Sequence, residues 1–381
     1  MNRHFGFISI GILLFLLSGH TSAHKASDSY LRFKMENGAI QAQWDIALRD
    51  LDYAIGLDNN GDGRITWGEL RVRHQAVTEY ALSRLQIHGD GSRCQPQIPG
   101  HLVDHHTDGA YAVLRFAVIC PTAIDTFEVA YGLLFDLDSL HRGLLQVDVN
   151  GRVQTGVLSP GQRKIRLDLG NSAPWREFLQ FGREGVWHIW IGFDHILFLV
   201  SLLLPAVLCW QAGRWLPRYS LRLALWEVFK IVTAFTIAHS ITLCLAVLGL
   251  VSLPSRWVES VIAASVLLAA LHNLYPVIRT RLWVMTFIFG LIHGLGFASV
   301  LIDLGLPGQS LAFALAGFNL GVEAGQIVIV GLFVPLAFML RHTRFYQRYV
   351  LRFGSVLIAL IAGIWLVERS MELDLGLPGL I

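Results

Sequence analysis

The sequence predicts a polytopic α-helical membrane protein with six transmembrane helices and an N-terminal extracytoplasmic β-rich domain. The first observation is composition: 54% of the 381 residues are hydrophobic and only 15% are charged, less charge than a soluble protein of this length carries. The second is patterning, because short alternating runs fill the first half of the chain and long apolar stretches fill the second. We therefore expect a lipid bilayer as the surroundings, and the net charge of +2 does not indicate nucleic-acid binding.

Residues 1–23 are typical of a secretory signal peptide. A short positive region precedes an apolar core of about 13 residues, which is too short to span a bilayer comfortably. Thr21, Ser22 and Ala23 then offer small side chains for cleavage; the alternative is an uncleaved anchor. The signal places the next part of the chain outside the cytoplasm. We expect an integral protein of a bacterial inner membrane with its N-terminal domain in the periplasm.

Residues 24–170 are expected to form a β-sandwich-like domain with a helical insertion. Their β-rich runs are SYLRFKM, AIQAQWDIAL, AYAVLRFAVI, DTFEVAYGLLF, GLLQVDV and GRVQTGVL. Cys94 and Cys120 are the two cysteines of this region, and an oxidising compartment favours a disulfide between them. Residues 171–185 are expected to approach the membrane as an interfacial amphipathic segment or as a simple linker.

The segment 58–69, DNNGDGRITWGE, resembles an EF-hand calcium loop and lies in the helical insertion. Side-chain oxygens at alternate positions would wrap a hard cation, Gly63 would permit the sharp turn, and a final glutamate would close the site with two oxygens. We expect a structural calcium ion there, and the alternative is an Asp- and Gly-rich turn that binds nothing. The expected Ca²⁺ ligands are Asp58, Asn60, Asp62, the Arg64 carbonyl, Thr66 and Glu69.

Residues 186–381 are expected to form the membrane domain, because they contain six apolar stretches near the roughly 20 residues that a spanning helix needs. These stretches are 187–209, 224–250, 257–276, 282–302, 311–340 and 349–367. With the N-terminal domain outside, alternate connecting loops are cytoplasmic, and those loops carry most of the arginines, as the positive-inside rule requires. The cytoplasmic arginines are Arg214, Arg218, Arg222, Arg279, Arg281, Arg341, Arg344 and Arg348, whereas the opposite loops hold Arg256 and little else.

The most informative residues are His188, Asp194 and His195, which lie in the first apolar stretch. Ionisable side chains at membrane depth are costly and usually face a cavity, a partner or an ion path. On a straight helix His188 and His195 share a face but lie about 10.5 Å apart, so they should not share one ion unless the helix breaks, which Gly192 permits. Otherwise, either Asp194 and His195 belong to a site completed by other helices, or the histidines are successive stations along a path. A hydrogen-bonded structural pair of histidines is the remaining alternative.

Further polar residues in the apolar stretches extend this set. His239 lies in the second stretch, and His293 lies in the fourth beside glycines that favour close helix packing. In the fifth stretch, Asn319, Glu323 and Gln326 form one polar stripe beside a glycine at every fourth position. The expected ligands of a transported metal ion are His188, Asp194, His195, His239, His293, Asn319 and Glu323.

The spacing of His188, Asp194 and His195, together with the segments FTIAHS and LIHGLGFAS, resembles the HupE/UreJ family of hydrogenase and urease accessory membrane proteins. The similarity covers roughly residues 185–370. This resemblance implies permeation of a divalent transition metal, nickel or cobalt, with His188, Asp194, His195 and His293 as functional positions. The chain departs from the short family pattern because it carries a large extracytoplasmic domain with a calcium-type loop.

The expected function is therefore secondary transport of Ni²⁺ or Co²⁺ and not an enzymatic reaction; imidazole and carboxylate ligands would also accept Zn²⁺ or copper. The sequence contains no GxxxxGK[ST] loop for direct ATP use. In this scheme Glu259 lies at an outer vestibule where the ion sheds water. One alternative is an intramembrane zinc hydrolase with Glu259 or Glu323 as general base. Another is a non-transporting, metal-responsive accessory protein whose calcium-loop domain docks a partner.

Overall fold

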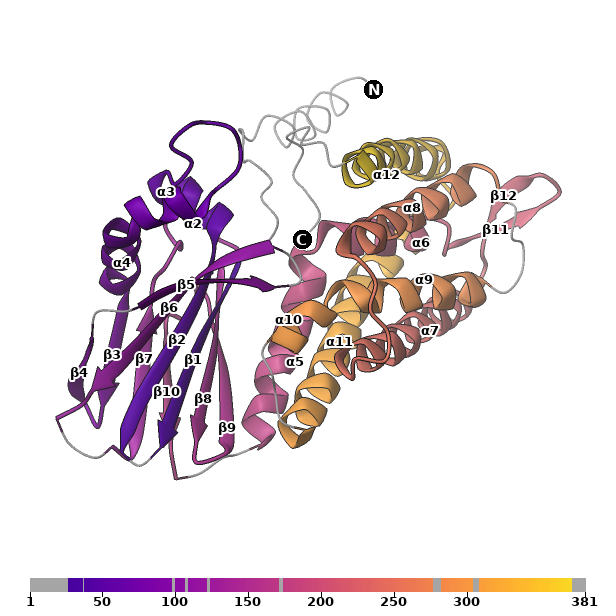
Figure 1. Ribbon diagram of the computed structural model, residues 1–381. Helices are drawn as coiled ribbons and strands as arrows, with labels where there is room; N and C mark the ends of the chain where they lie inside the picture. Colours follow the sequence, from indigo (N-terminus) through magenta and orange to yellow (C-terminus); the bar gives the residue numbers. More distant parts are fainter. Residues whose placement is uncertain are drawn as a thin grey trace, which may run out of the picture.

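The computed structural model describes residues 27–36, 38–97, 100–106, 109–121, 124–170, 174–276, 282–303 and 308–371. The predicted signal peptide lies outside the described residues. Figure 1 shows a β-rich N-terminal part beside a helical C-terminal part. The expected β-rich N-terminal domain is thereby confirmed.

The N-terminal part is a folded-over β-sheet that encloses one core. Its strands are β1 (Asp28–Glu36), β2 (Ala39–Ala47), β3 (Leu85–Gly89), β4 (Ser92–Pro96), β5 (Gly100–His106), β6 (Gly109–Ile119), β7 (Thr126–Tyr131), β8 (Arg142–Val149), β9 (Arg152–Leu158) and β10 (Lys164–Asp168). The hydrogen-bonded order is β10-β7-β3-β4-β6-β2-β1-β8-β9, and β5 pairs with β6. Because β4 pairs with both β3 and β6, the chain passes there from one layer to the other. The layers face each other as in a β-sandwich.

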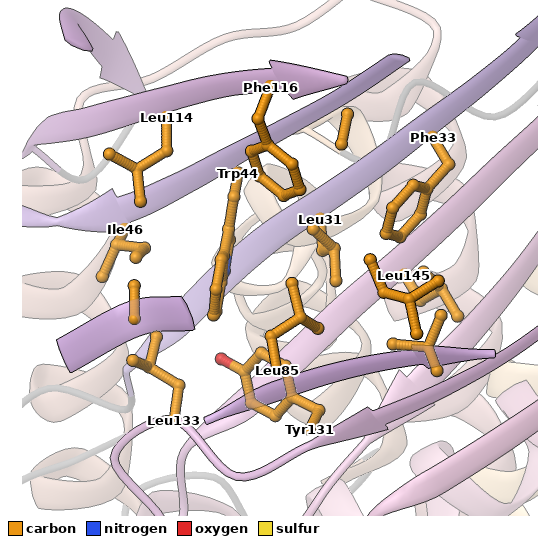
Figure 2. Packing of buried hydrophobic residues seen from close by; sticks show 14 of the residues in the cluster. Leu31, Phe33, Trp44, Ile46, Leu85, Leu114, Phe116, Tyr131, Leu133 and Leu145 are labelled. Carbon is orange, nitrogen blue, oxygen red and sulfur yellow. The ribbon is translucent and has the colours of Figure 1, made fainter. Parts of the chain in front are cut away.

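Alternate residues of the strands fill the space between the layers (Figure 2). Leu31 on β1 and Trp44 on β2 are fully buried, and they face Leu85 and Tyr131 of the opposite layer. Burial of an aromatic side chain of this size contributes a few kcal/mol, so this core is the main source of stability in the domain.

Three helices connect β2 to β3 and form the insertion: α2 (Leu48–Ile55), α3 (Trp67–Val72) and α4 (His74–Ser83). The segment 58–69 joins α2 to α3. Gly56 terminates α2 in a left-handed conformation with φ of 66°. Thr66 starts α3 by a capping box, in which its side chain accepts from the Glu69 amide while Glu69 accepts from the Thr66 amide.

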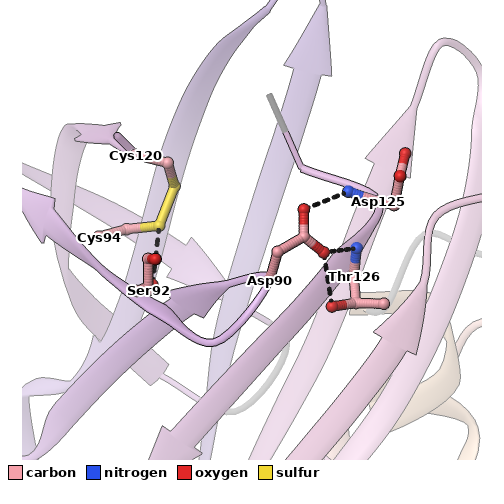
Figure 3. Close-up of a disulfide and its surroundings, with 6 residues drawn as sticks. All are labelled: Asp90, Ser92, Cys94, Cys120, Asp125 and Thr126. Atoms are coloured by element: carbon pink, nitrogen blue, oxygen red, sulfur yellow. Dashed lines mark hydrogen bonds between the residues drawn. A yellow bond between two sulfur atoms is a disulfide. The ribbon is translucent and has the colours of Figure 1, made fainter. Parts of the chain in front are cut away.

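The expected disulfide is present between Cys94 on β4 and Cys120, which follows β6 (Figure 3). Nearby, the Asp90 carboxylate accepts hydrogen bonds from the amides of Asp125 and Thr126 and from the Thr126 hydroxyl. These donors hold the pKa of Asp90 below its usual value. The disulfide and Asp90 thus fix the loops at one end of the sandwich.

The C-terminal part is helical and contains one small hairpin. Its elements are α5 (Pro174–Ile191), α6 (Phe193–Leu203), the hairpin β11 (Leu208–Gln211) and β12 (Arg214–Pro217), α7 (Leu221–Val247), α8 (Ser255–Leu274), α9 (Leu282–Gly296), α10 (Ala298–Asp303), α11 (Gly308–Leu340), the π-helix η1 (Tyr346–Phe353) and α12 (Gly354–Met371). Arg142 on β8 forms a 3.1 Å ion pair with Glu184 on α5, which ties the two parts together.

Six transmembrane helices are not confirmed. Four segments within the described residues are long and apolar enough to cross a membrane: Leu221–Val247, Ser255–Leu274, Ser310–Leu340 and Tyr346–Met371. A fifth span requires α5 and α6 together, and these helices meet at a 70° bend. The predicted span 282–302 divides into α9 and α10, and α9 alone is a shorter apolar helix. Four or five apolar helices of membrane-spanning length nevertheless identify an integral membrane protein.

Glycines bring two helix pairs into close contact, as the sequence predicts. Gly317, Gly321 and Gly325 of α11 lie against the backbone of α5, where Gly182 sits opposite. Gly290 of α9 lies against the backbone of α7, where an added Cβ would lie 2.5 Å from the Phe235 carbonyl oxygen. At Gly290, Gly317 and Gly321 these contacts leave no room for a methyl group, so glycine sets the separation of α9 from α7 and of α11 from α5.

Candidate metal centre

The break between α5 and α6 is the feature that builds the site. His188 lies in the last turn of α5, and Asp194 and His195 lie in the first turn of α6. At the break an added Cβ on Gly192 would lie 2.8 Å from the His188 carbonyl oxygen, so this position requires glycine. The bend brings the rings of His188 and His195 to a centroid separation of 4.6 Å. The helix therefore breaks at Gly192, and the straight-helix separation of about 10.5 Å does not describe this structure.

A third helix completes the cluster. His293 on α9 approaches so that one ligand atom each from Asp194, His195 and His293 lie within 4.8 Å of one another. Their side chains are almost fully buried, with 0%, 4% and 1% of the residue surface exposed. Within the described residues, the potential ligands that lie close enough in a group of three or more to hold one metal ion are Asp194, His195 and His293.

The hydrogen bonds within the cluster fix which atoms can bind a cation. The Nδ1 atom of His195 lies 2.8 Å from Oδ1 of Asp194. Because an ionised carboxylate only accepts, Nδ1 of His195 carries the hydrogen and Nε2 presents its lone pair. That Nε2 and the second carboxylate oxygen of Asp194, Oδ2, are buried without a hydrogen-bond partner. Two lone-pair donors are therefore left for a metal ion.

Ser265 on α8 fixes the tautomer of His293 in the same way that Asp194 fixes the tautomer of His195. The Ser265 hydroxyl donates to the Ile262 carbonyl at 2.6 Å, so its oxygen must accept from Nε2 of His293 at 2.9 Å. The hydrogen is then on Nε2, and the buried, unpartnered Nδ1 of His293 presents its lone pair. An outer partner that fixes the tautomer of a ligand histidine is typical of protein metal sites. Sequence patterns did not predict a role for Ser265, because a single serine in an apolar helix usually bonds only its own backbone.

His188 on α5 is not part of this three-residue group, although its ring lies beside that of His195. The other predicted ligands, His239, Asn319 and Glu323, form a second layer between α7 and α11. His239 lies 3.4 Å from Asn319 through Nδ1, Thr236 donates to Gln326 at 3.1 Å, and Thr233 donates to Glu323 at 3.2 Å. Asn319 and Glu323 are therefore not brought into the cluster of Asp194, His195 and His293. His239 shares features of both layers. Its Nδ1 contacts Asn319, whereas its Nε2 is buried without a partner, as are the ligand atoms of the cluster.

Aromatic rings enclose the histidines. Phe297 and Phe318 stack at 4.1 Å and both pack against His188, with centroid separations of 5.0 Å and 5.4 Å. Phe235 and Phe198 pack against His293 from the other side. This apolar enclosure lowers the local dielectric, so a bare cation would be held only by the lone pairs that the cluster supplies.

Glu259 does not face the cluster as a free carboxylate. It forms an ion pair of 3.1 Å with Arg369 near the ends of α8 and α12. A carboxylate neutralised by arginine is a poor first ligand for an incoming dication and a poor general base. The expectation of an outer vestibule at Glu259 is therefore not supported by this geometry.

In the calcium-type loop the potential ligand side chains accept hydrogen bonds from the loop backbone. Asp58 accepts from the amides of Gly61 and Gly63 at 2.8 Å, and Asp62 accepts from the Arg64 amide at 2.8 Å. Asn60 accepts from the Asp62 amide, and Glu69 accepts from Thr66. The Thr66 amide is the main cause of a lowered pKa of Glu69, so this carboxylate is ionised at neutral pH. Calcium binding stays a prediction.

Comparison with known proteins adds the family. A family model described as HupE / UreJ protein matches residues 164–369, more than half of the chain. The chain belongs to the HupE/UreJ family. The matched region contains every residue of the intramembrane cluster, and the resemblance expected from the histidine and aspartate spacing is confirmed. HupE/UreJ proteins are associated with metal uptake or accessory roles and are not an enzyme family. No curated protein matches the chain significantly.

Proposed function

We propose that this HupE/UreJ protein carries a divalent transition-metal ion, Ni²⁺ first and Co²⁺ second, across a bacterial inner membrane, with its β-rich domain in the periplasm. The observation that carries the proposal is the buried cluster of Asp194, His195 and His293, in which each residue also has one buried ligand atom without a hydrogen-bond partner. Buried polar atoms without partners are costly, and a bound cation would satisfy them. Two imidazoles and a carboxylate suit borderline first-row metals better than Mg²⁺ or Ca²⁺.

The number of ligands supports transport over permanent binding. Three protein ligands leave part of the coordination shell to water or to a neighbouring side chain, so the ion can leave again. His188 and His239 each present an unpartnered buried nitrogen and would serve as stations before and after the cluster. A dication that moves inward gains roughly 4.6 kcal/mol per 100 mV of membrane potential, which is sufficient for accumulation without ATP.

The hydrolase alternative has weaker support. A zinc hydrolase needs a general base close to metal-bound water. The two candidate glutamates are engaged elsewhere, Glu259 with Arg369 and Glu323 with Thr233. Within the part of the chain that the structure describes, the contacts of these two glutamates do not place either one beside the cluster.

Radiolabelled nickel uptake into proteoliposomes tests the proposed transport. We expect saturable uptake under an imposed potential, competition by cobalt, and loss of uptake in His195→Ala. His272→Ala is a matched control, because His272 lies seven residues beyond Ser265 on α8, about 10 Å further along the helix, and should retain uptake. Uptake that is absent in wild-type protein, for every metal tried, would exclude the permease interpretation.

We also propose that the loop 58–69 binds a structural calcium ion. Gly63 at its sixth position has a φ of 75°, the conformation that the sharp EF-hand turn needs. The helix α2 ends at Ile55, before the loop, and α3 begins at Trp67, the tenth position of the loop. A bound ion would take the place of the backbone hydrogen bonds that Asp58 and Asp62 accept, and it would link α2 to α3.

A further inference from the structure

The π-helix η1 presents a basic and an aromatic stripe side by side. In a π-helix each amide bonds the carbonyl five residues back, so residues four apart lie nearly above one another. Phe345, which precedes η1, Tyr349 and Phe353 have this spacing and are 43%, 54% and 64% exposed. The rings of Phe345 and Tyr349 have centroids 6.1 Å apart, so these two rings are neighbours on the surface.

The arginines at 344, 348 and 352 have the same spacing and precede the aromatic residues by one position. All three are exposed. No carboxylate pairs with them within the described part of the chain, and the sequence contains no Asp or Glu between residues 324 and 367. By contrast, Arg218 and Arg341 on the same side are used by the fold, since each donates to a main-chain carbonyl. The three arginines are therefore an uncompensated positive surface.

The candidate span Tyr346–Met371 includes η1 and, with 26 residues, is longer than the hydrocarbon core of a bilayer requires. The helix α12 that follows has 18 residues and is about 27 Å long, close to the thickness of the hydrocarbon core of a bilayer. If α12 crosses that core, η1 lies in the headgroup layer at its start. Aromatic rings prefer this layer, and arginines there meet lipid phosphates.

The opposite face of η1 is fixed to the rest of the helical part. Tyr346 is 2% exposed, and its hydroxyl donates to the Leu204 carbonyl at 2.8 Å, directly after α6. Leu351 is fully buried in the same apolar cluster as Phe198. Because α6 also carries Asp194 and His195, whatever holds η1 at the membrane surface also holds the helix that builds the metal centre.

We propose that the surface formed by Arg344, Arg348, Arg352 and the aromatic stripe binds an anionic phospholipid, such as phosphatidylglycerol, of the cytoplasmic leaflet. The arginines contact the phosphate, and the aromatic rings pack along the upper parts of the acyl chains. The positive charge of the three arginines at headgroup depth is complementary to an anionic lipid. The proposal is independent of metal transport.

Native mass spectrometry of the full chain in detergent tests it, with equal amounts of phosphatidylglycerol and phosphatidylcholine added. Wild-type protein should retain phosphatidylglycerol preferentially. The preference should fall about fivefold for Arg348→Gln, and it should vanish when all three arginines are changed to glutamine. Arg214→Gln, which removes an exposed arginine from the hairpin on the same side, is the matched control and should keep the preference.

Changing the same three arginines to lysine keeps the charge and should keep the preference, which separates phosphate binding from a folding defect. Equal retention of both lipids by wild-type protein overturns the proposal. The proposal is also overturned if the triple glutamine variant prefers phosphatidylglycerol as strongly as Arg214→Gln does. Displacement of the bound lipid by millimolar inorganic phosphate, or by a short oligonucleotide, would also overturn it, since the surface would then recognise free phosphate groups.

Discussion

Changing Gly290 to alanine tests the close approach of α9 to α7. The new Cβ would lie 2.5 Å from the Phe235 carbonyl oxygen and 3.0 Å from the Ala238 Cβ. Ordinary van der Waals contact begins near 3.4 Å, so α9 must move away from α7 by about 1 Å. Backbone atoms of a packed helix do not yield easily, and the strain costs about 1–3 kcal/mol. His293 lies one turn further along α9 and moves with it.

The displacement has a consequence for metal binding that stability alone does not show. Metal–nitrogen distances vary by only about 0.2 Å, so a ligand that moves by about 1 Å no longer bonds the same ion. We expect nickel affinity to fall at least tenfold and the Tm to fall by a few degrees. Thermal unfolding and equilibrium nickel binding in detergent measure the two effects.

Gly363→Ala is the control, because nothing lies within 4 Å of a Cβ added there in α12. This change should leave nickel affinity unaltered and should stabilise the helix by up to about 1 kcal/mol. If Gly290→Ala bound nickel and unfolded like Gly363→Ala, the close helix contact would not position His293, and the reasoning would fail.

Three further predictions concern other parts of the chain. Ser265→Ala should weaken nickel binding about tenfold by releasing the tautomer of His293, and Ser265→Thr should restore it; equal affinity in all three proteins would contradict this role. Burial and the neighbouring His74 lower the pKa of His101 to about 4, so the folded state favours the neutral ring. The stability that His101 contributes above pH 6.5 is therefore lost as the pH falls from about 6.5 to 4. Because the ring is only partly buried, we expect about 1–2 kcal/mol, seen as a flatter pH dependence of Tm in His101→Gln. Calcium should raise the Tm of wild-type protein but not that of Asp58→Ala. At a calcium concentration a hundredfold above Kd, the free energy of unfolding should increase by roughly 2.7 kcal/mol. An identical rise of Tm in both proteins would exclude the loop as the site.

Sequence patterns predicted the parts of the fold that depend on local spacing. The alternating runs predicted β1, β2, β6, β7, β8 and β9 but missed the shorter strands β3, β4, β5 and β10. The glycines at every fourth position of α11 predicted a close helix contact, which α11 makes with α5. The disulfide followed from the compartment and the number of cysteines, since Cys94 had a single partner available. Each of these features depends on short-range periodicity or on counting, which a single sequence contains.

The number of spans and the composition of the centre were harder to predict. Hydropathy does not distinguish a straight span from two helices that meet at Gly192, because the bend leaves the apolar composition unchanged. His188, Asp194, His195 and His293 were found because ionisable residues in apolar stretches are rare. The placement of Asn319 in a second layer depends on how α7 and α11 pack, which no local pattern specifies.

Equilibrium dialysis of radioactive nickel against the purified full chain tests the central claim most directly. The structure predicts saturable binding of nickel that is lost in both Asp194→Asn and His293→Ala and kept in His272→Ala, because only the first two remove a ligand atom from the buried cluster. Binding that survives both cluster changes, or wild-type protein that binds no nickel at any concentration up to millimolar, would contradict the account.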